Sequence, residues 1–195
     1  MVGKFFSTLM RYLTLAFVVC AILASCGNPF GLPAAFLTNI VDSSVTLYAL
    51  SGTPVHLPSG FLLYGGTTVR TDLSSQLDFA FDIDTAGQAV LLPTAALKLT
   101  AGSGFQSSPL VFDSIKIAPI TGYNDSTAFV VSENDVVLAR SARGNALSCT
   151  FNIINPLYAK LLVLDIDSAA RTITFQILGD NNCGYRGLEP GLPRH

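Results

Sequence analysis

Two pairs of acidic residues have a spacing in this sequence that could support chemistry. Asp82 and Asp84 are two residues apart, as are Asp165 and Asp167, so each pair projects from one face of an extended strand. Paired carboxylates can hydrolyse a glycosidic bond or bind a hard cation such as Ca²⁺. Asp82 also begins a D-x-D-x-x-G pattern, but Pro93 stands where a calcium loop carries glutamate. Aspartate beside a turn also caps turn amides, so a structural role is the alternative.

Histidine offers little catalytic potential in this chain. His56 lies between Pro54 and Pro58, and the only other histidine is His195. A Ser-His-Asp arrangement could use His56, but the sequence has no G-x-S-x-G nucleophile elbow. It also lacks a phosphate loop, a dinucleotide fingerprint and zinc-ligand spacing. We therefore predict no catalytic residue, no cofactor and no metal site, and an idle, exposed His56. The sequence leaves open whether the protein is an enzyme and favours one that is not.

Aromatic recognition is a further option. The chain has no Trp, which weakens a sugar-stacking platform, but it has six Tyr. Tyr123, between Gly122 and Asn124, suits an exposed binding tip. The alternative is a tyrosine half-buried at a strand end, with its hydroxyl group in water.

The first 26 residues have the layout of an export signal. Lys4 and Arg11 precede an uncharged apolar run from Tyr12 to Leu23, and small residues follow before Cys26. A helix needs roughly 20 apolar residues to span a bilayer, so this run is too short for a durable transmembrane anchor.

The segment Leu23-Ala24-Ser25-Cys26 resembles the lipobox of bacterial lipoproteins. The resemblance covers the leader alone. It implies that residues 1–25 are a signal peptide, that Cys26 gains a diacylglyceryl thioether, and that its new amine is acylated, for example with palmitate. Residues 26–43 would then be a lipidated lead-in. The expected location is the cell envelope, on a membrane outside the cytoplasm. Gly27 in place of Asp favours the outer membrane where the organism has one. An ordinary signal peptide or an N-terminal membrane helix is the alternative.

The remaining cysteines favour a disulfide bond. If Cys20 leaves with the signal peptide and Cys26 takes the lipid, Cys149 and Cys183 remain. Two leftover thiols in an oxidising compartment most simply pair with each other. A metal or redox pair has little support because no C-x-x-C motif is present.

The composition after residue 25 indicates one globular domain. Its 170 residues carry nine basic and 13 acidic side chains, with no basic stripe. Nucleic-acid binding depends on neutralising phosphates with Lys and Arg, so we do not expect it.

Alternation of apolar and polar residues predicts an all-β domain over residues 44–187. Gln76–Asp84 alternates, turns at Asp84–Gly87, and returns as Ala89–Leu92. A second hairpin joins Tyr158–Asp167 to Arg171–Leu178, and the apolar first strand suggests a central position covered on both faces. The other predicted strands are Val45–Leu50, Phe61–Tyr64, Leu97–Thr100, Leu110–Phe112, Ala128–Ser132, Val136–Arg140 and Leu147–Asn152.

About nine or ten short strands indicate an antiparallel β-sandwich, with a β-barrel as the alternative. Residues 188–195, rich in Gly and Pro, are expected to form a loose tail.

These patterns predict an exported, lipid-anchored binding or structural protein of the envelope. Its partners would be the membrane, through lipidated Cys26, and an envelope protein or glycan. The alternative is a hydrolase of envelope polymers that works through Asp82, Asp84, Asp165 and Asp167.

Overall fold

The computed structural model describes residues 32, 34–99, 102–141 and 156–193, and the chain divides into compact units at residues 1–34 and 35–195. The second unit holds all the described regular structure. Apart from one 3₁₀ turn, that structure consists of β-strands. The elements are β1 (Ile40–Tyr48), β2 (Gly60–Leu62), β3 (Thr67–Val69), β4 (Phe79–Ile83), β5 (Ala89–Pro93), β6 (Gly104–Ser108), η1 (Phe112–Ser114), β7 (Phe129–Val130), β8 (Val136–Arg140), β9 (Tyr158–Asp167) and β10 (Thr172–Gly179).

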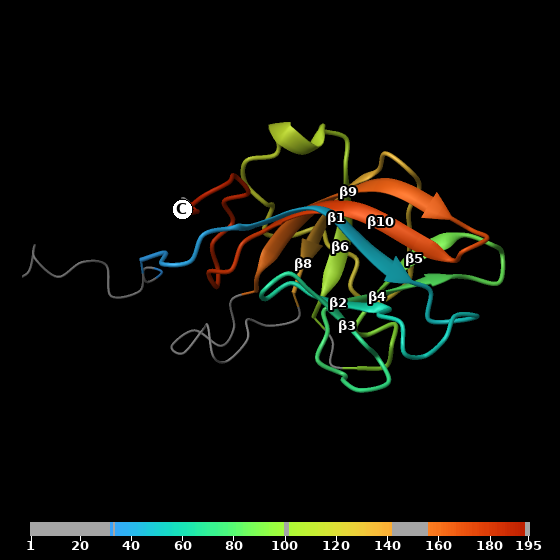
Figure 1. Ribbon diagram of the computed structural model, residues 1–195. Helices are drawn as coiled ribbons and strands as arrows, with labels where there is room; N and C mark the ends of the chain where they lie inside the picture. The colour runs from blue at the N-terminus through green and yellow to red at the C-terminus, as the bar shows by residue number, and fades with distance from the viewer. Residues whose placement is uncertain (1–31, 33, 100–101, 142–155, 194–195) are drawn as a thin grey trace, which may run out of the picture. The chain divides into compact units, whose positions relative to one another are not determined.

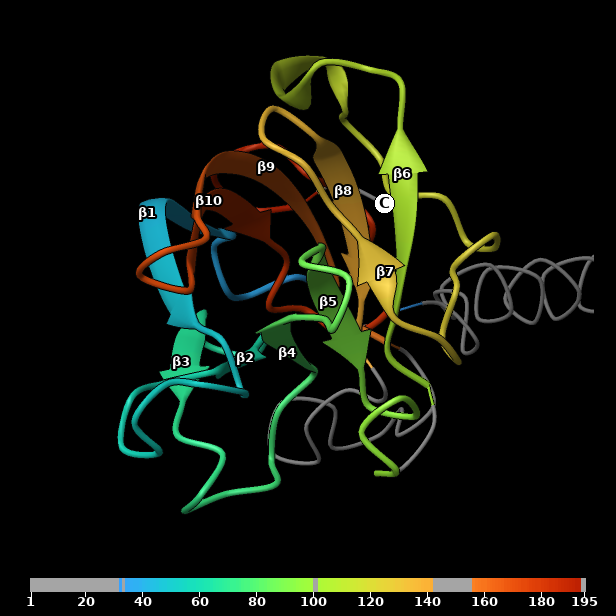
Figure 2. The same cartoon turned by 90° about the vertical axis from the view of Figure 1, so that its right-hand side faces the viewer.

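The strands form two antiparallel sheets. Sheet A has the order β1-β10-β9-β8-β6, and sheet B has the order β3-β2-β4-β5-β7. Figure 2 shows sheet A curving along one side of the unit, with the strands of sheet B on the other. In each sheet, the first and last strands of the order do not pair with each other. Neither sheet therefore closes on itself. The predicted all-β sandwich is therefore confirmed, and the barrel alternative is wrong.

Both predicted hairpins are present. β4 pairs with β5, and the connecting turn places Gly87 at φ 80°, in the left-handed region that glycine tolerates best. β9 pairs with β10 in the same way. Local alternation and turn residues are sufficient to specify such pairs because the two strands are adjacent in the sequence.

Among the described residues, five buried phenylalanines belong to the core between the sheets: Phe61, Phe79, Phe81, Phe105 and Phe175. The ring of Phe79, on β4, lies 5.3 Å from Phe61 of sheet B and 5.3 Å from Phe105 of sheet A. It also lies 6.2 Å from the ring of Phe175 on β10. Phe79 therefore contacts both layers of the sandwich.

β9 is covered on both of its faces, as predicted. Leu161 and Val163 belong to the core between the sheets, whereas Tyr158 packs with Phe112 and Leu188 on the outside. Figure 1 shows the segment that carries η1 on the outer side of sheet A. This cover explains why β9 reads as a nearly continuous apolar run.

Several predicted strands are wrong. Leu97–Leu99 is a turn, stabilised by the hydrogen bond from the Leu99 N–H to the Thr94 carbonyl, and Leu110–Phe112 bends into η1. Leu147–Asn152 lies outside the described residues. The sequence analysis missed β3 and β6, since Thr67–Val69 is short and Gly104–Ser108 has no apolar alternation. β6 exists because it pairs with the more apolar β8.

Arg171 joins the two sheets at one end of the sandwich. Its guanidinium donates to the carbonyls of Ser51, at 2.7 Å, and Ile83, at 3.0 Å, and it lies 3.6 Å from Asp82. We expect Arg171→Ala to lower the free energy of unfolding by about 1–2 kcal/mol, because two charge-assisted hydrogen bonds are lost at a partly exposed site. Urea denaturation would measure the change. The control is Arg70→Ala, which removes an exposed ion pair with Asp72 and should leave stability unchanged. Equal effects of the two substitutions would contradict this role.

Candidate functional site

Asp82 and Asp84 both serve the backbone around the β4–β5 hairpin. Asp82 accepts hydrogen bonds from the N–H and the hydroxyl of Ser51, at 3.0 and 2.8 Å. Asp84 Oδ1 accepts the N–H groups of Ala86 and Gln88 in the turn. The two carboxylates therefore have the turn-capping and loop-fixing roles that were the structural alternative.

The second acid pair lies on the other sheet. Asp165 and Asp167 are exposed at the end of β9, and Asp167 caps the following turn by accepting the N–H groups of Ala169 and Ala170. Within the part of the chain that the structure describes, no three His, Cys, Asp or Glu side chains gather where they could hold a metal ion. The two aspartate pairs therefore have separate local roles.

His56 is exposed in a turn closed by the hydrogen bond from the Leu57 N–H to the Pro54 carbonyl. The proline-bracketed segment is thus a loop, and the histidine side chain faces solvent.

The expectation of Tyr123 as an exposed binding tip is wrong. Its hydroxyl group donates to the Pro119 carbonyl at 3.1 Å, and its ring lies 6.1 Å from the ring of Tyr158. The Arg140 guanidinium sits 5.0 Å from the centre of the Tyr123 ring. Burial raises the pKa of Tyr123 above its ordinary value. Tyr123 therefore packs with Tyr158 in the apolar cluster on the outer face of sheet A.

Of the cysteines assigned roles from the sequence, the described residues include Cys183. Its side chain is buried at the edge of the main core. Cys26 and Cys149 lie outside the described residues, so lipidation and the Cys149–Cys183 disulfide stay predictions.

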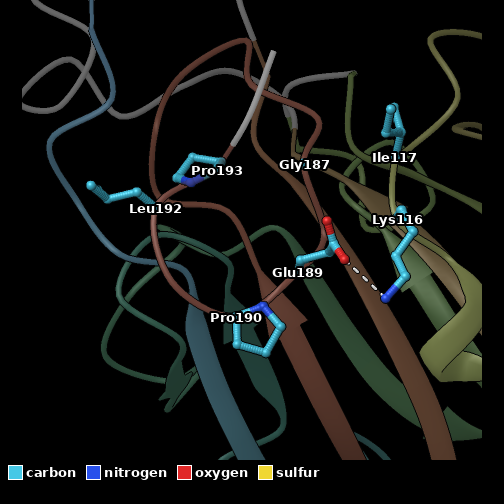
Figure 3. Close-up of a pocket in the computed structure, with 7 residues that line it drawn as sticks. All are labelled: Lys116, Ile117, Gly187, Glu189, Pro190, Leu192 and Pro193. Carbon is cyan, nitrogen blue, oxygen red and sulfur yellow. Dashed lines mark ion pairs between the residues drawn. The ribbon is translucent and has the colours of Figure 1, made fainter.

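A surface depression lies at the end of the sandwich where β1 begins. We call it the terminal cleft, and its volume is about 630 Å³. Figure 3 shows its walls, with Lys116 and Ile117 on one side and Leu192 and Pro193 on the other. The full lining is Lys116, Ile117, Gly187, Glu189, Pro190, Leu192 and Pro193.

Asn39, just before β1, anchors the C-terminal wall of this cleft. Its side-chain amide donates to the carbonyls of Gly187, at 2.7 Å, and Glu189, at 2.8 Å, and its N–H donates to the Gly191 carbonyl. Leu188 is fully buried, and its N–H bonds to the Lys116 carbonyl. Residues 188–191, expected from composition to belong to a loose tail, are therefore fixed to the domain by these contacts.

Lys160 supports the opposite wall. It points outward from β9 yet is only 3% exposed, because the η1 segment covers it. Its ammonium donates to the carbonyls of Phe112 and Ile115, both at 2.9 Å, and lies 4.6 Å from the centre of the Phe112 ring. Burial lowers the pKa of Lys160. These bonds fix the backbone that leads directly into Lys116 and Ile117.

Asp180 and Asn182 attach the segment before β1 to the same end. Asn182 Oδ1 accepts the N–H groups of Phe36 and Leu37, and its amide donates to the Leu37 carbonyl. Asp180, 1% exposed, accepts the N–H and the side-chain amide of Asn182 through one oxygen. Its other oxygen, Oδ2, has no hydrogen-bond partner among the residues that the structure describes. Burial raises the pKa of Asp180 to about 6.

The polar lining of the terminal cleft is neutral overall. Lys116 and Glu189 form an exposed ion pair at 2.9 Å. Beside them, Ile117 and Leu192 expose 54% and 57% of their surfaces. The cleft thus presents apolar side chains around a compensated charge pair, an arrangement suited to contact with another surface rather than to acid–base chemistry.

The sequence analysis did not find this site. Its walls come from a loop and from the Gly- and Pro-rich end of the chain, and neither carries a motif. The available signal was Asp180-Asn181-Asn182, a polar run after the predicted strand Arg171–Leu178, which by itself also fits an ordinary turn.

Comparisons with known proteins add no family to this description: no family model matches the chain, and no similar curated protein was found. Among the described residues, no helix is both long enough and apolar enough to cross a membrane.

Proposed function

We propose that this protein is an exported lipoprotein whose β-sandwich works by surface contact, as a binding or structural component of the cell envelope. The observation that carries the proposal is the lipobox-like segment Leu23-Ala24-Ser25-Cys26 behind Lys4, Arg11 and a short apolar run. In this proposal the lipid on Cys26 holds the domain at a membrane outside the cytoplasm, which is the outer membrane where one exists. An envelope protein or glycan is the proposed partner.

The uses of the ionisable side chains support a contact role. The four aspartates considered for hydrolysis lie at the ends of two hairpins, where they cap turns, fix a loop or face solvent. The terminal cleft contains Glu189, which is paired with Lys116. A hydrolase of the proposed kind needs two carboxylates facing one substrate. None of the contacts at these aspartates favours that alternative.

A disulfide between Cys149 and Cys183 completes the proposal. In an oxidising compartment it would close a loop of the chain that contains β9 and β10, with Cys183 held in the core. Such a crosslink suits a domain that must stay folded outside the cytoplasm.

The lipid anchor is tested by comparing the full-length chain with Cys26→Ser in a bacterial host. We expect the unaltered chain to incorporate labelled palmitate and to show, by mass spectrometry, a mature N-terminus at residue 26 that carries acyl groups. Cys26→Ser should incorporate no label and keep its leader, because the acylated sulfur is missing.

Cys20→Ser is the matched control, since it removes a leader cysteine outside the lipobox and should behave like the unaltered chain. An unmodified Cys26 thiol, or equal labelling of all three proteins, would refute the anchor. Peptides from the same sample, digested without reduction, report whether Cys149 is linked to Cys183.

A further inference from the structure

Three exposed apolar side chains gather at the end of the sandwich that the proposed anchor would hold nearest the membrane. They are Phe36, Ile117 and Leu192, exposed by 68%, 54% and 57%, and we call them the terminal patch. Exposed apolar side chains that lie close together often mark a site of contact with another surface.

Hydrogen bonds between distant parts of the sequence hold the three residues at one end. Phe36 is fixed through its N–H to Asn182, and Leu192 follows Gly191, whose carbonyl accepts the Asn39 N–H. Ile117 lies between Lys116 and Ala118, which pair with the backbone of Leu188 and Arg186. In Figure 1 the start of β1 and the C-terminal segment lie at the same end of the sandwich.

The tether joins the domain at this end, so the patch is the part of the domain nearest the proposed lipid anchor along the chain. Ten residues separate Cys26 from Phe36, a reach of at most about 35 Å when fully extended. β1 then carries the chain away from this end over nine residues, a distance of about 26 Å between Ile40 and Tyr48. The loop with Val55 is therefore at the opposite end, where Figure 1 shows it beyond the far end of β1.

We infer that the terminal patch is a membrane-docking face, whose partner is the surface of the bilayer that holds the lipid anchor. The inference rests on the proposed function. A short tether gives the patch a high effective concentration at the bilayer, so three side chains suffice for a contact that would be too weak in a free protein. Lys116 beside the patch is neutralised by Glu189, so this pair adds no net charge that would oppose insertion into the lipid headgroups.

The absence of tryptophan from the chain permits a direct test. Ile117→Trp and Leu192→Trp each place a single fluorophore in the patch, and Val55→Trp, at a position 75% exposed, is the control at the opposite end. The full-length lipidated proteins are reconstituted into vesicles of phosphatidylethanolamine and phosphatidylglycerol, with or without bromine on the acyl chains. Circular dichroism verifies that each variant folds.

We expect brominated lipid to remove most of the emission of Ile117→Trp and Leu192→Trp but little of that of Val55→Trp. Adding Phe36→Ser and Leu192→Ser to Ile117→Trp should restore emission while the protein still floats with the vesicles. If the proteins float but all three Trp residues are quenched equally, or no Trp is quenched, the docking face is refuted and the anchor still stands. Failure to float overturns the anchor itself, and with it the basis of this inference.

Discussion

Phe79→Ala is expected to lower the free energy of unfolding by about 3–5 kcal/mol, the range for removing a fully buried phenylalanine. Phe79 is 1% exposed, and its ring contacts Phe61 in its own sheet and Phe105 in the facing sheet. Alanine would leave a cavity between the layers that neighbouring strands cannot close without losing their ladder hydrogen bonds. Urea denaturation of a soluble form beginning at residue 27, followed by circular dichroism, measures the change.

Phe36→Ala is the matched control, because the same side chain is removed from a position 68% exposed. Its stability in solution should stay within about 0.5 kcal/mol of the parent. Similar losses for the two substitutions would show that Phe79 is not the contact between the sheets described above.

Asp180→Asn is expected to stabilise the protein by about 3 kcal/mol near pH 8, with the gain vanishing below about pH 4. The pKa of Asp180 is raised from 3.8 to about 6 by burial in the folded state. The unfolded chain therefore loses this proton at a lower pH than the folded chain. Between pH 3.8 and about pH 6 the folded state loses stability as pH rises. Above about pH 6 the full cost of the buried charge is present. Asparagine carries no charge, and its oxygen can still accept the Asn182 N–H.

The measurement is the difference in unfolding free energy between the parent and Asp180→Asn across this pH range, so that groups shared by both proteins cancel. Asp165→Asn, at an exposed position on β9, is the control and should change the unfolding free energy by less than about 0.5 kcal/mol. A constant difference at all pH values would mean that Asp180 stays charged, or stays neutral, throughout.

The hairpins and the central strand were predictable because their signals are local. Alternation over Gln76–Asp84 and a glycine able to adopt positive φ specify β4, its turn and β5 within a short window. The bounds of β9 agree with prediction because its first part, which is covered on both faces, is mostly apolar. β6 was missed for the opposite reason: Gln106, Ser107 and Ser108 become strand residues through their partners on β8, which lie about 30 residues away along the chain.

The terminal cleft could not be predicted from local patterns. The bond from Asn39 to the Gly187 carbonyl joins residues 148 positions apart, and that from Asn182 to the Leu37 carbonyl joins residues 145 positions apart. The burial of Lys160 and Asp180 likewise depends on segments that cover them from elsewhere in the chain. Charged residues are ordinarily exposed, so a sequence pattern assigns them to the surface.

The sequence alone determined the sandwich class, its two main hairpins and the turn positions of the aspartates, since these follow from periodicity and from residues in direct succession. It also supplied the lipobox-like segment Leu23-Ala24-Ser25-Cys26 on which the proposed anchor depends. Only the tertiary structure decided that Tyr123 is packed, that residues 188–191 are fixed, and that Phe36, Ile117 and Leu192 share one end. Those outcomes depend on hydrogen bonds and burial between distant segments, which exist only once the two sheets have packed.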